Sequence, residues 1–206
     1  MFFKLSVLKH MLKDAYKSSG LTVGHMAESG TGEPEGYYAA GSWWVMWFDK
    51  AKMPKEVKGA LVELCGDLPD TGEVFKAIKD MGNQYEIEQK DIYNLPYAFK
   101  KCDYRFRVTR LLKQQKFDLI RFLQDEKEIR SVKAVSETCI SLIDPSAVDQ
   151  DNGEDMPDGP ITIGPSADFM YWGNNTCYFM AGTRKPILED EEEMRLWDHL
   201  TKIKIK

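Results

Sequence analysis

The sequence predicts an α+β protein: an antiparallel sheet of β-hairpins packed by N-terminal, middle and C-terminal helices. Three observations lead to this prediction. Apolar residues recur at helical spacing near the N-terminus, in the middle and near the C-terminus of the chain. Between these stretches, apolar and aromatic runs come in pairs separated by short turn segments, as in β-hairpins. No stretch of the 206 residues reads as a linker, so we expect a single domain, residues 1–206.

A helix and a loop are expected at the N-terminus. Residues 2–18 place apolar side chains at helical spacing, and Gly20 follows where a C-terminal cap belongs. The apolar side of this helix consists of Leu5, Leu8, Leu12 and Ala15. Residues 20–36 contain five glycines and are therefore expected to form a flexible loop.

An aromatic stretch and the middle helix come next. Residues 37–48 are rich in aromatic side chains and end at Asp49, which predicts one or two buried strands. Residues 53–66 predict a helix, because Pro54 stands at an early helical position and Gly66 can end it. The apolar face of this helix consists of Val57, Leu61 and Leu64.

The following segment predicts a first hairpin and a less regular stretch. Residues 74–78 and 84–88 form two runs suited to strands, and residues 80–83 supply the turn residues between them. Residues 91–101 are either a short helix or irregular, because Pro96 interrupts the pattern.

A second hairpin is expected from residues 104–112 and 117–124, around the polar residues 113–116. Residues 129–143 fit either a helix or a strand, and their content of Ser, Thr and Val favours a strand. Residues 144–160 are rich in Asp, Pro, Asn and Gly, which predicts a loop.

The C-terminal part predicts a final hairpin and a closing helix. Residues 169–172 and 177–181 are the expected strands, with residues 173–175 as their turn. Residues 189–203 predict a helix with acidic first turns and a basic last turn, which suit the helix dipole. Its apolar face consists of Met194, Trp197 and Leu200.

The charge distribution singles out the second hairpin. Residues 100–121 hold eight basic and two acidic residues, a net charge of +6. Basic and apolar residues alternate strictly at its start, which puts Arg105 and Arg107 on one strand face and Tyr104, Phe106 and Val108 on the other. Lys113 and Lys116 are expected at its tip. Such a hairpin suits phosphate or an acidic protein surface. The candidate binding residues are Arg105, Arg107, Arg110, Lys113, Lys116 and Arg121.

The alternative is an ordinary solvated sheet face whose charges pair within the molecule. Residues 144–160 hold six acidic residues and no basic one, a charge of −6, so this loop is a candidate partner for the hairpin. A second candidate surface comes from the aromatic stretch. Trp43 and Trp44 cannot share a face of one strand, so one of them packs under a helix or lies exposed at a surface that binds something.

Composition excludes several classes of protein. A net charge of −5 and a pI of about 5.4 argue against a general nucleic-acid binder. The most apolar run, residues 37–48, is shorter than the roughly 20 residues that span a bilayer, and the N-terminus lacks the pattern of a signal peptide. The four cysteines are widely spaced and read as reduced thiols. We therefore expect a cytoplasmic protein without a membrane partner.

Motifs for catalysis, cofactors and metals are not recognisable in the sequence. The glycines at 30 and 32 precede an expected strand and lack the third glycine of the dinucleotide fingerprint. The three histidines are far apart, and the acidic residues 149–155 do not keep the register of a calcium-binding EF-hand loop. The neighbours of each cysteine favour a buried structural role. We therefore assign no catalytic residue, no metal ligand and no cofactor.

These observations predict a non-enzymatic binding protein that acts through an electrostatic surface. A protein partner is favoured, and nucleic acid remains an alternative through the local basic hairpin. We hypothesise an accessory or inhibitor protein of a phage or mobile element, from the lack of enzyme and transport signatures alone. The alternative is a small enzyme acting on a phosphorylated or nucleotide substrate, with its site assembled by folding. A deep pocket with convergent polar groups would favour the enzyme, and a flat or convex basic face the binding protein.

Overall fold

A computed structural model of the chain describes residues 1–28, 30, 32–85, 88–144 and 153–205. Within these residues, eleven strands join in one antiparallel sheet in the order β5-β4-β1-β2-β3-β11-β10-β9-β6-β7-β8, and five α-helices pack on it. This is the predicted α+β class. No helix in the described part of the chain is long and apolar enough to cross a membrane.

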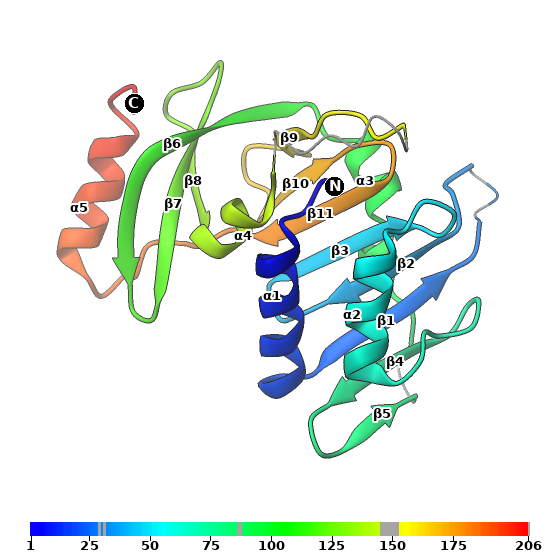
Figure 1. The fold of residues 1–206 in the computed structure, drawn as a ribbon. Helices are drawn as coiled ribbons and strands as arrows, with labels where there is room; N and C mark the ends of the chain where they lie inside the picture. The colour runs from blue at the N-terminus through cyan, green and yellow to red at the C-terminus, as the bar shows by residue number, and fades with distance from the viewer. Residues whose placement is uncertain (29, 31, 86–87, 145–152, 206) are drawn as a thin grey trace.

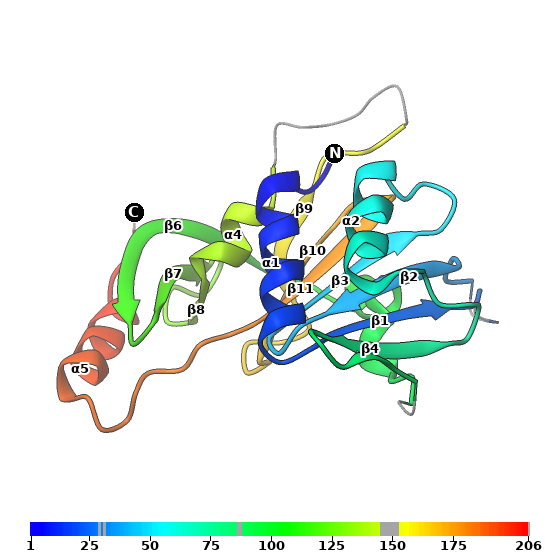
Figure 2. The ribbon, with the colours of Figure 1, turned by 60° about the horizontal axis from the view of Figure 1, so that its bottom comes forward.

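The larger part of the sheet lies between two layers of helix. Its strands are β1 (Leu21–Met26), β2 (Gly36–Ala40), β3 (Trp44–Asp49), β4 (Val74–Ile78), β5 (Gly82–Gln84), β9 (Asp158–Thr162), β10 (Phe169–Gly173) and β11 (Cys177–Gly182). Helices α1 (Leu5–Lys17) and α2 (Lys55–Cys65) lie side by side on one face, as Figures 1 and 2 show. The short helices η1 (Asp91–Tyr93) and α3 (Leu95–Lys100) cover the other face.

The aromatic stretch is buried because both faces of its strands are covered. Met46 and Phe48 of β3 point into the core under α1 and α2, where Phe48 meets the ring of Phe3 at 5.6 Å. Val45 and Trp47 point into the second core, under α3. A strand that is buried on both faces reads as a continuous apolar run, which is why this segment lacks alternation.

A smaller sheet extends from one end of the larger one. Strand β6 (Tyr104–Gln115) pairs with β9 at its first two residues, then leaves it and continues alongside β7 (Asp118–Asp125), as Figure 1 shows. β7 pairs in turn with β8 (Val132–Ser136), and α4 (Glu137–Leu142) follows directly. Helix α5 (Glu191–Leu200) covers one face of this sheet, with the ring of Trp197 5.2 Å from that of Phe122.

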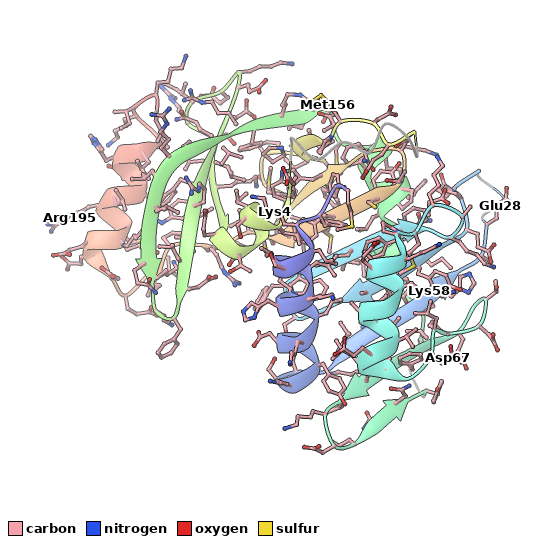
Figure 3. The ribbon with its side chains drawn as sticks, in the orientation of Figure 1. Lys4, Glu28, Lys58, Asp67, Met156 and Arg195 are labelled. Atoms are coloured by element: carbon pink, nitrogen blue, oxygen red, sulfur yellow. The ribbon has the colours of Figure 1, made fainter. Side chains whose placement is uncertain are left out.

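The outer faces of the helices are charged and exposed. Figure 3 shows Lys4 before α1, Lys58 on α2 and Arg195 on α5, each on the solvent side of its element. Arg195 pairs with Glu191, one turn earlier on the same helix. The exposed helix faces therefore follow the amphipathic pattern that the sequence predicts.

Several predicted elements are confirmed. The N-terminal helix is α1 and the middle helix is α2, with Gly66 as its C-cap. Residues 37–48 form two buried strands, β2 and β3, and the final hairpin is β10 and β11. Residues 91–101 are helical in two short pieces, η1 and α3, with Pro96 in the first turn of α3.

The prediction of a flexible loop over residues 20–36 is wrong for residues 21–26, which form β1, an interior strand of the sheet between β4 and β2. Two of the glycines serve close packing and not flexibility. A Cβ on Gly24 would lie 2.2 Å from the ring of Tyr38, and a Cβ on Gly36 would lie 2.2 Å from Trp47. These glycines are required because a bulky side chain from the neighbouring strand crosses their backbone.

The expected strand over residues 129–143 is right for residues 132–136 and wrong for the remainder. The chain forms β8 up to Ser136 and then turns into α4. The expected loop over residues 144–160 ends in β9 from Asp158, and residues 145–152 lie outside the described part of the chain.

Three further features differ from the predictions. The expected strand over residues 84–88 is wrong except at Gln84, because β5 spans Gly82–Gln84, while Tyr85 and Glu88 lie outside any strand and residues 86–87 lie outside the described part of the chain. Asp80 in the left-handed region, with φ of 64°, closes the turn earlier than predicted. In the second hairpin, the turn has two residues instead of four, so Lys113 lies within β6, opposite Ile120. On α5, Met194 is exposed, and Glu193 lies in the buried face instead.

Candidate functional site

The basic hairpin, as we call strands β6 and β7 with their turn (residues 104–125), carries all six candidate binding residues. Its turn consists of Lys116 and Phe117. Lys116 has a φ of 52°, in the left-handed region that favours glycine, and the side chain of Phe117 is fully exposed. The tip of the hairpin therefore combines a strained backbone with an uncovered aromatic ring.

Arg105 is paired within the molecule. Its guanidinium donates two hydrogen bonds to the carboxylate of Asp158, one of them 3.0 Å long. The hydrogen bonding with Arg105 lowers the pKa of Asp158, and the same interaction raises the pKa of Arg105. Asp158 belongs to the acidic segment 144–160, so this pair is the internal neutralisation that the alternative interpretation describes.

Arg107 anchors the C-terminal segment. Its Nη2 donates to the side-chain oxygen of Gln124 and to the carbonyl of Ile205, at 2.5 and 2.6 Å. The Gln124 amide donates in turn to the carbonyls of Ile129 and Ile203, both at 2.7 Å. These hydrogen bonds hold the segment after α5 against the base of the basic hairpin.

Arg121 joins the basic hairpin to helix α4. Its Nε and Nη2 donate to the two carboxylate oxygens of Glu137, each at 2.6 Å, and its Nη1 donates to the carbonyl of Thr109. Hydrogen bonding to Glu137 raises the pKa of Arg121. A bidentate pair of this kind fixes the relative orientation of its two side chains, so Arg121 holds β7 in place against α4.

Lys113 joins the basic hairpin to helix α5. Its Nζ lies 3.2 Å from a carboxylate oxygen of Glu193, whose side chain is 1% exposed. Glu193 also accepts hydrogen bonds from the side chain of Gln115 and from the backbone N–H of Ile187. Burial raises the pKa of Glu193, but these hydrogen bonds and the ion pair outweigh burial and hold its pKa below the ordinary value of 4.5.

Two of the six candidate residues remain free for contact with another molecule. The side chains of Arg110 and Lys116 are exposed, and neither has a partner within the described residues. Of the three apolar residues expected opposite Arg105 and Arg107, only Phe106 is buried, whereas Tyr104 and Val108 are exposed. The uncommitted positive charge is therefore concentrated in the distal half of the basic hairpin.

A cleft of about 700 Å³ lies beside the tip, between α1, the β2–β3 turn and the start of α4. Trp43 and Phe117 line it, and Trp43 is the exposed member of the Trp43–Trp44 pair. The guanidinium of Arg184 lies 5.1 Å from the ring of Trp43, and Asp118 holds it with two hydrogen bonds of 3.0 and 3.1 Å. The cleft thus presents two aromatic rings beside an arginine that is already neutralised.

Cys139 also lines this cleft, and burial raises the pKa of its thiol to about 12. A thiol of this kind is protonated at neutral pH and is a poor nucleophile. Within the described residues, no group of three or more His, Cys, Asp or Glu side chains is placed to hold a metal ion.

Sequence reasoning missed Phe117 as a candidate contact. The available signal was one aromatic residue in an otherwise polar turn, next to Lys116 and Asp118. The predicted hairpin makes it the first residue of a strand, a position whose side chain can face the core. Only the two-residue turn places its ring in solvent.

Comparisons with known proteins found no similar protein: no family model matches the chain, and neither curated sequences nor solved structures give a significant match.

Proposed function

We propose that the protein is a non-enzymatic binding protein whose basic hairpin takes a protein partner with an acidic surface. One observation carries this proposal. Arg110, Lys116 and Phe117 are exposed together in the distal half of the hairpin, whereas Arg105, Arg107, Lys113 and Arg121 are paired within the molecule.

The tip has features that stability alone does not explain. Phe117 leaves its whole ring in water, which gains nothing for folding, and exposed aromatic anchors are enriched in the centres of protein interfaces. Lys116 holds a left-handed backbone conformation that glycine would adopt at lower cost. Strain retained at an exposed site supports a role in binding.

A protein partner fits this surface better than nucleic acid does. Nucleic-acid binding draws on several phosphate contacts, each with its own Lys or Arg, and only two basic side chains of the candidate set are free here. The protein as a whole carries a charge of −5, which repels a polyanion. Two cations around an aromatic ring match an acidic protein segment with an apolar residue.

The cytoplasm is the compartment that we propose. Its support is the state of the four cysteines, Cys65, Cys102, Cys139 and Cys177, all of which are free thiols. Free thiols of this number are usual where glutathione and thioredoxin keep proteins reduced. We also propose that the protein has an accessory or inhibitor role, as in a phage or mobile element. Identification of the partner tests this role.

Site-specific photo-crosslinking in native cells tests the proposed function. A benzophenone amino acid at position 117 should give one discrete, light-dependent adduct with another protein. The matched control is position 81, because Met81 is also an exposed apolar residue in a hairpin turn, at the other end of the sheet. Equal adducts at both positions, or none at position 117, would contradict the proposal.

A further inference from the structure

The outer edge of β6 is open beyond its first residues. β9 pairs only with Tyr104 and Arg105, whereas β7 accompanies β6 on its other side to the turn. Within the described residues, β6 has no strand neighbour on its outer side after Arg105. Figures 1 and 2 both show this half of β6 as the outermost strand of the smaller sheet.

The turn determines which backbone groups face that open edge. Lys116 and Phe117 form a hydrogen-bonded turn between Gln115 and Asp118, so these two flanking residues exchange backbone hydrogen bonds. Hydrogen-bonded and non-hydrogen-bonded pairs alternate along an antiparallel ladder. Leu112 and Gln114 therefore stand in non-hydrogen-bonded pairs, and their N–H and C=O groups point to the open side.

A bulge separates this edge from the rest of β6. The register shifts between Val108 and Leu112, and hydrogen bonds of the Thr109 hydroxyl stabilise the irregular backbone between them. That hydroxyl accepts from the N–H of Leu111 at 3.2 Å and donates to the carbonyl of Phe122 at 2.8 Å. Beyond the bulge, residues 112–115 form a regular stretch, so the length available there for pairing with another strand is four residues.

The charges beside the edge select the kind of segment that fits. Arg110 and Lys116 flank residues 112–115 at either end, and both side chains lack a partner within the described residues. Antiparallel pairing with a second copy that sets Leu112 against Gln114 would set Arg110 against Lys116 of that copy. Like charges directly opposite each other in a sheet are destabilising, whereas carboxylates in these positions are favourable.

We propose that the partner contributes an extended acidic segment that adds as a strand to the outer edge of β6 at residues 112–115. This inference rests on the proposed function, since it names the part of the partner that the basic hairpin takes. The backbone of the segment pairs with Leu112 and Gln114, and its carboxylates lie near Arg110 and Lys116. Strand addition gives affinity through main-chain hydrogen bonds, and the flanking charges give selectivity.

An alternating Glu-Val octapeptide is the probe, because it is acidic, extended and free of specific sequence. Titrated into the ¹⁵N-labelled protein, it should bind with a Kd below about 1 mM and slow the hydrogen exchange of the Leu112 and Gln114 amides. An octapeptide N-methylated at every residue, which has no backbone N–H on either edge and cannot complete the ladder, should not bind. A Lys-Val octapeptide should not bind either, because its charges are reversed.

Two variants of one residue separate the backbone from the side chain. Gln114→Ala keeps the outward N–H and should bind the Glu-Val octapeptide as the unmodified protein does. Gln114→Pro removes that N–H, which the ladder with β7 does not use, and should weaken binding by about tenfold or more while the melting curve shows a folded protein.

Each contrary outcome overturns the inference. These outcomes are no binding of the Glu-Val octapeptide, equal binding of its N-methylated form, slowed exchange elsewhere than at Leu112 and Gln114, and unchanged binding by a folded Gln114→Pro variant. Dimerisation of the free protein that Gln114→Pro abolishes would assign the edge to a second copy instead. If one of these results is found together with a discrete crosslinked adduct at position 117, strand addition is rejected. The proposed function, binding of a protein partner at the basic hairpin, is then retained.

Discussion

Lys113 of β6 and Glu193 of α5 form an ion pair of 3.2 Å around a carboxylate that is almost fully buried. The two residues are 80 positions apart in the chain, so the pair holds two distant segments together. A buried carboxylate with its partners is costly to disturb, because removing one member leaves the other desolvated and unpaired.

Glu193→Ala should lower the free energy of unfolding by about 3 kcal/mol at pH 7, because Lys113 and the Ile187 amide lose their acceptor. Urea denaturation measures this loss. Glu191→Ala is the matched control, since Glu191 lies on the exposed side of the same helix turn and should change stability by no more than about 0.5 kcal/mol. Equal effects of the two substitutions would contradict the structural role of Glu193.

The same carboxylate predicts a pH dependence. The pKa of Glu193 is lower in the folded protein than its ordinary value of 4.5, so its stabilisation is complete above about pH 4.5. It is lost as the pH falls through the folded pKa. Denaturation curves from pH 7 to pH 3 should show the difference between the unmodified protein and Glu193→Gln shrinking below pH 4.5. A difference that stays constant over this range would disprove the assignment.

Lys116→Gly should raise the free energy of unfolding by up to about 1 kcal/mol, because glycine adopts the left-handed turn without the cost that a Cβ imposes. It should also weaken partner binding, since it removes one of the two free cations. Asp80→Gly is the matched control in the β4–β5 turn, where Asp80 has a φ of 64°. It should stabilise the protein similarly and leave binding unchanged. Thermal melts and a binding assay distinguish the two sites.

Gly24→Ala should destabilise the protein by about 1–3 kcal/mol, because the new methyl group would lie 2.2 Å from the ring of Tyr38 unless the strands shift. Gly59→Ala provides the contrast on α2, where a Cβ meets nothing within 4 Å and should stabilise the helix by up to about 1 kcal/mol. Chemical denaturation of both variants measures whether the free energy of unfolding falls or rises. A neutral Gly24→Ala would mean that β1 and β2 lie further apart than in this structure.

The helices and hairpins that the sequence predicted are those with local signals. In α2, the proline near its start and Gly66 after its end lie within the segment that they delimit. Strand β1 was missed because the reason for Gly24 lies in Tyr38 on the next strand, outside the local pattern. The turn at Ser136 between β8 and α4 was missed because the same apolar residues fit both a strand and a helix.

The candidate site was predictable in place but not in detail. Alternation located the basic strand, yet the partners of Arg105 and Arg107 are Asp158 and Ile205, which lie 53 and 98 residues further along the chain. No periodicity connects such distant positions. Which cations are neutralised and which remain free is therefore a property of the folded chain, and it decides which part of the basic hairpin is available for binding.

The distal half of the basic hairpin is the proposed binding site for a protein partner. The most direct test of this claim is the affinity of the crosslinked partner for a variant carrying Arg110→Glu, Lys116→Glu and Phe117→Ser. All three side chains are exposed, so the melting temperature should change little. We expect the affinity to fall by about a hundredfold or more, since two charges are reversed and the aromatic anchor is lost. A folded triple variant that binds the partner as tightly as the unmodified protein would contradict the claim.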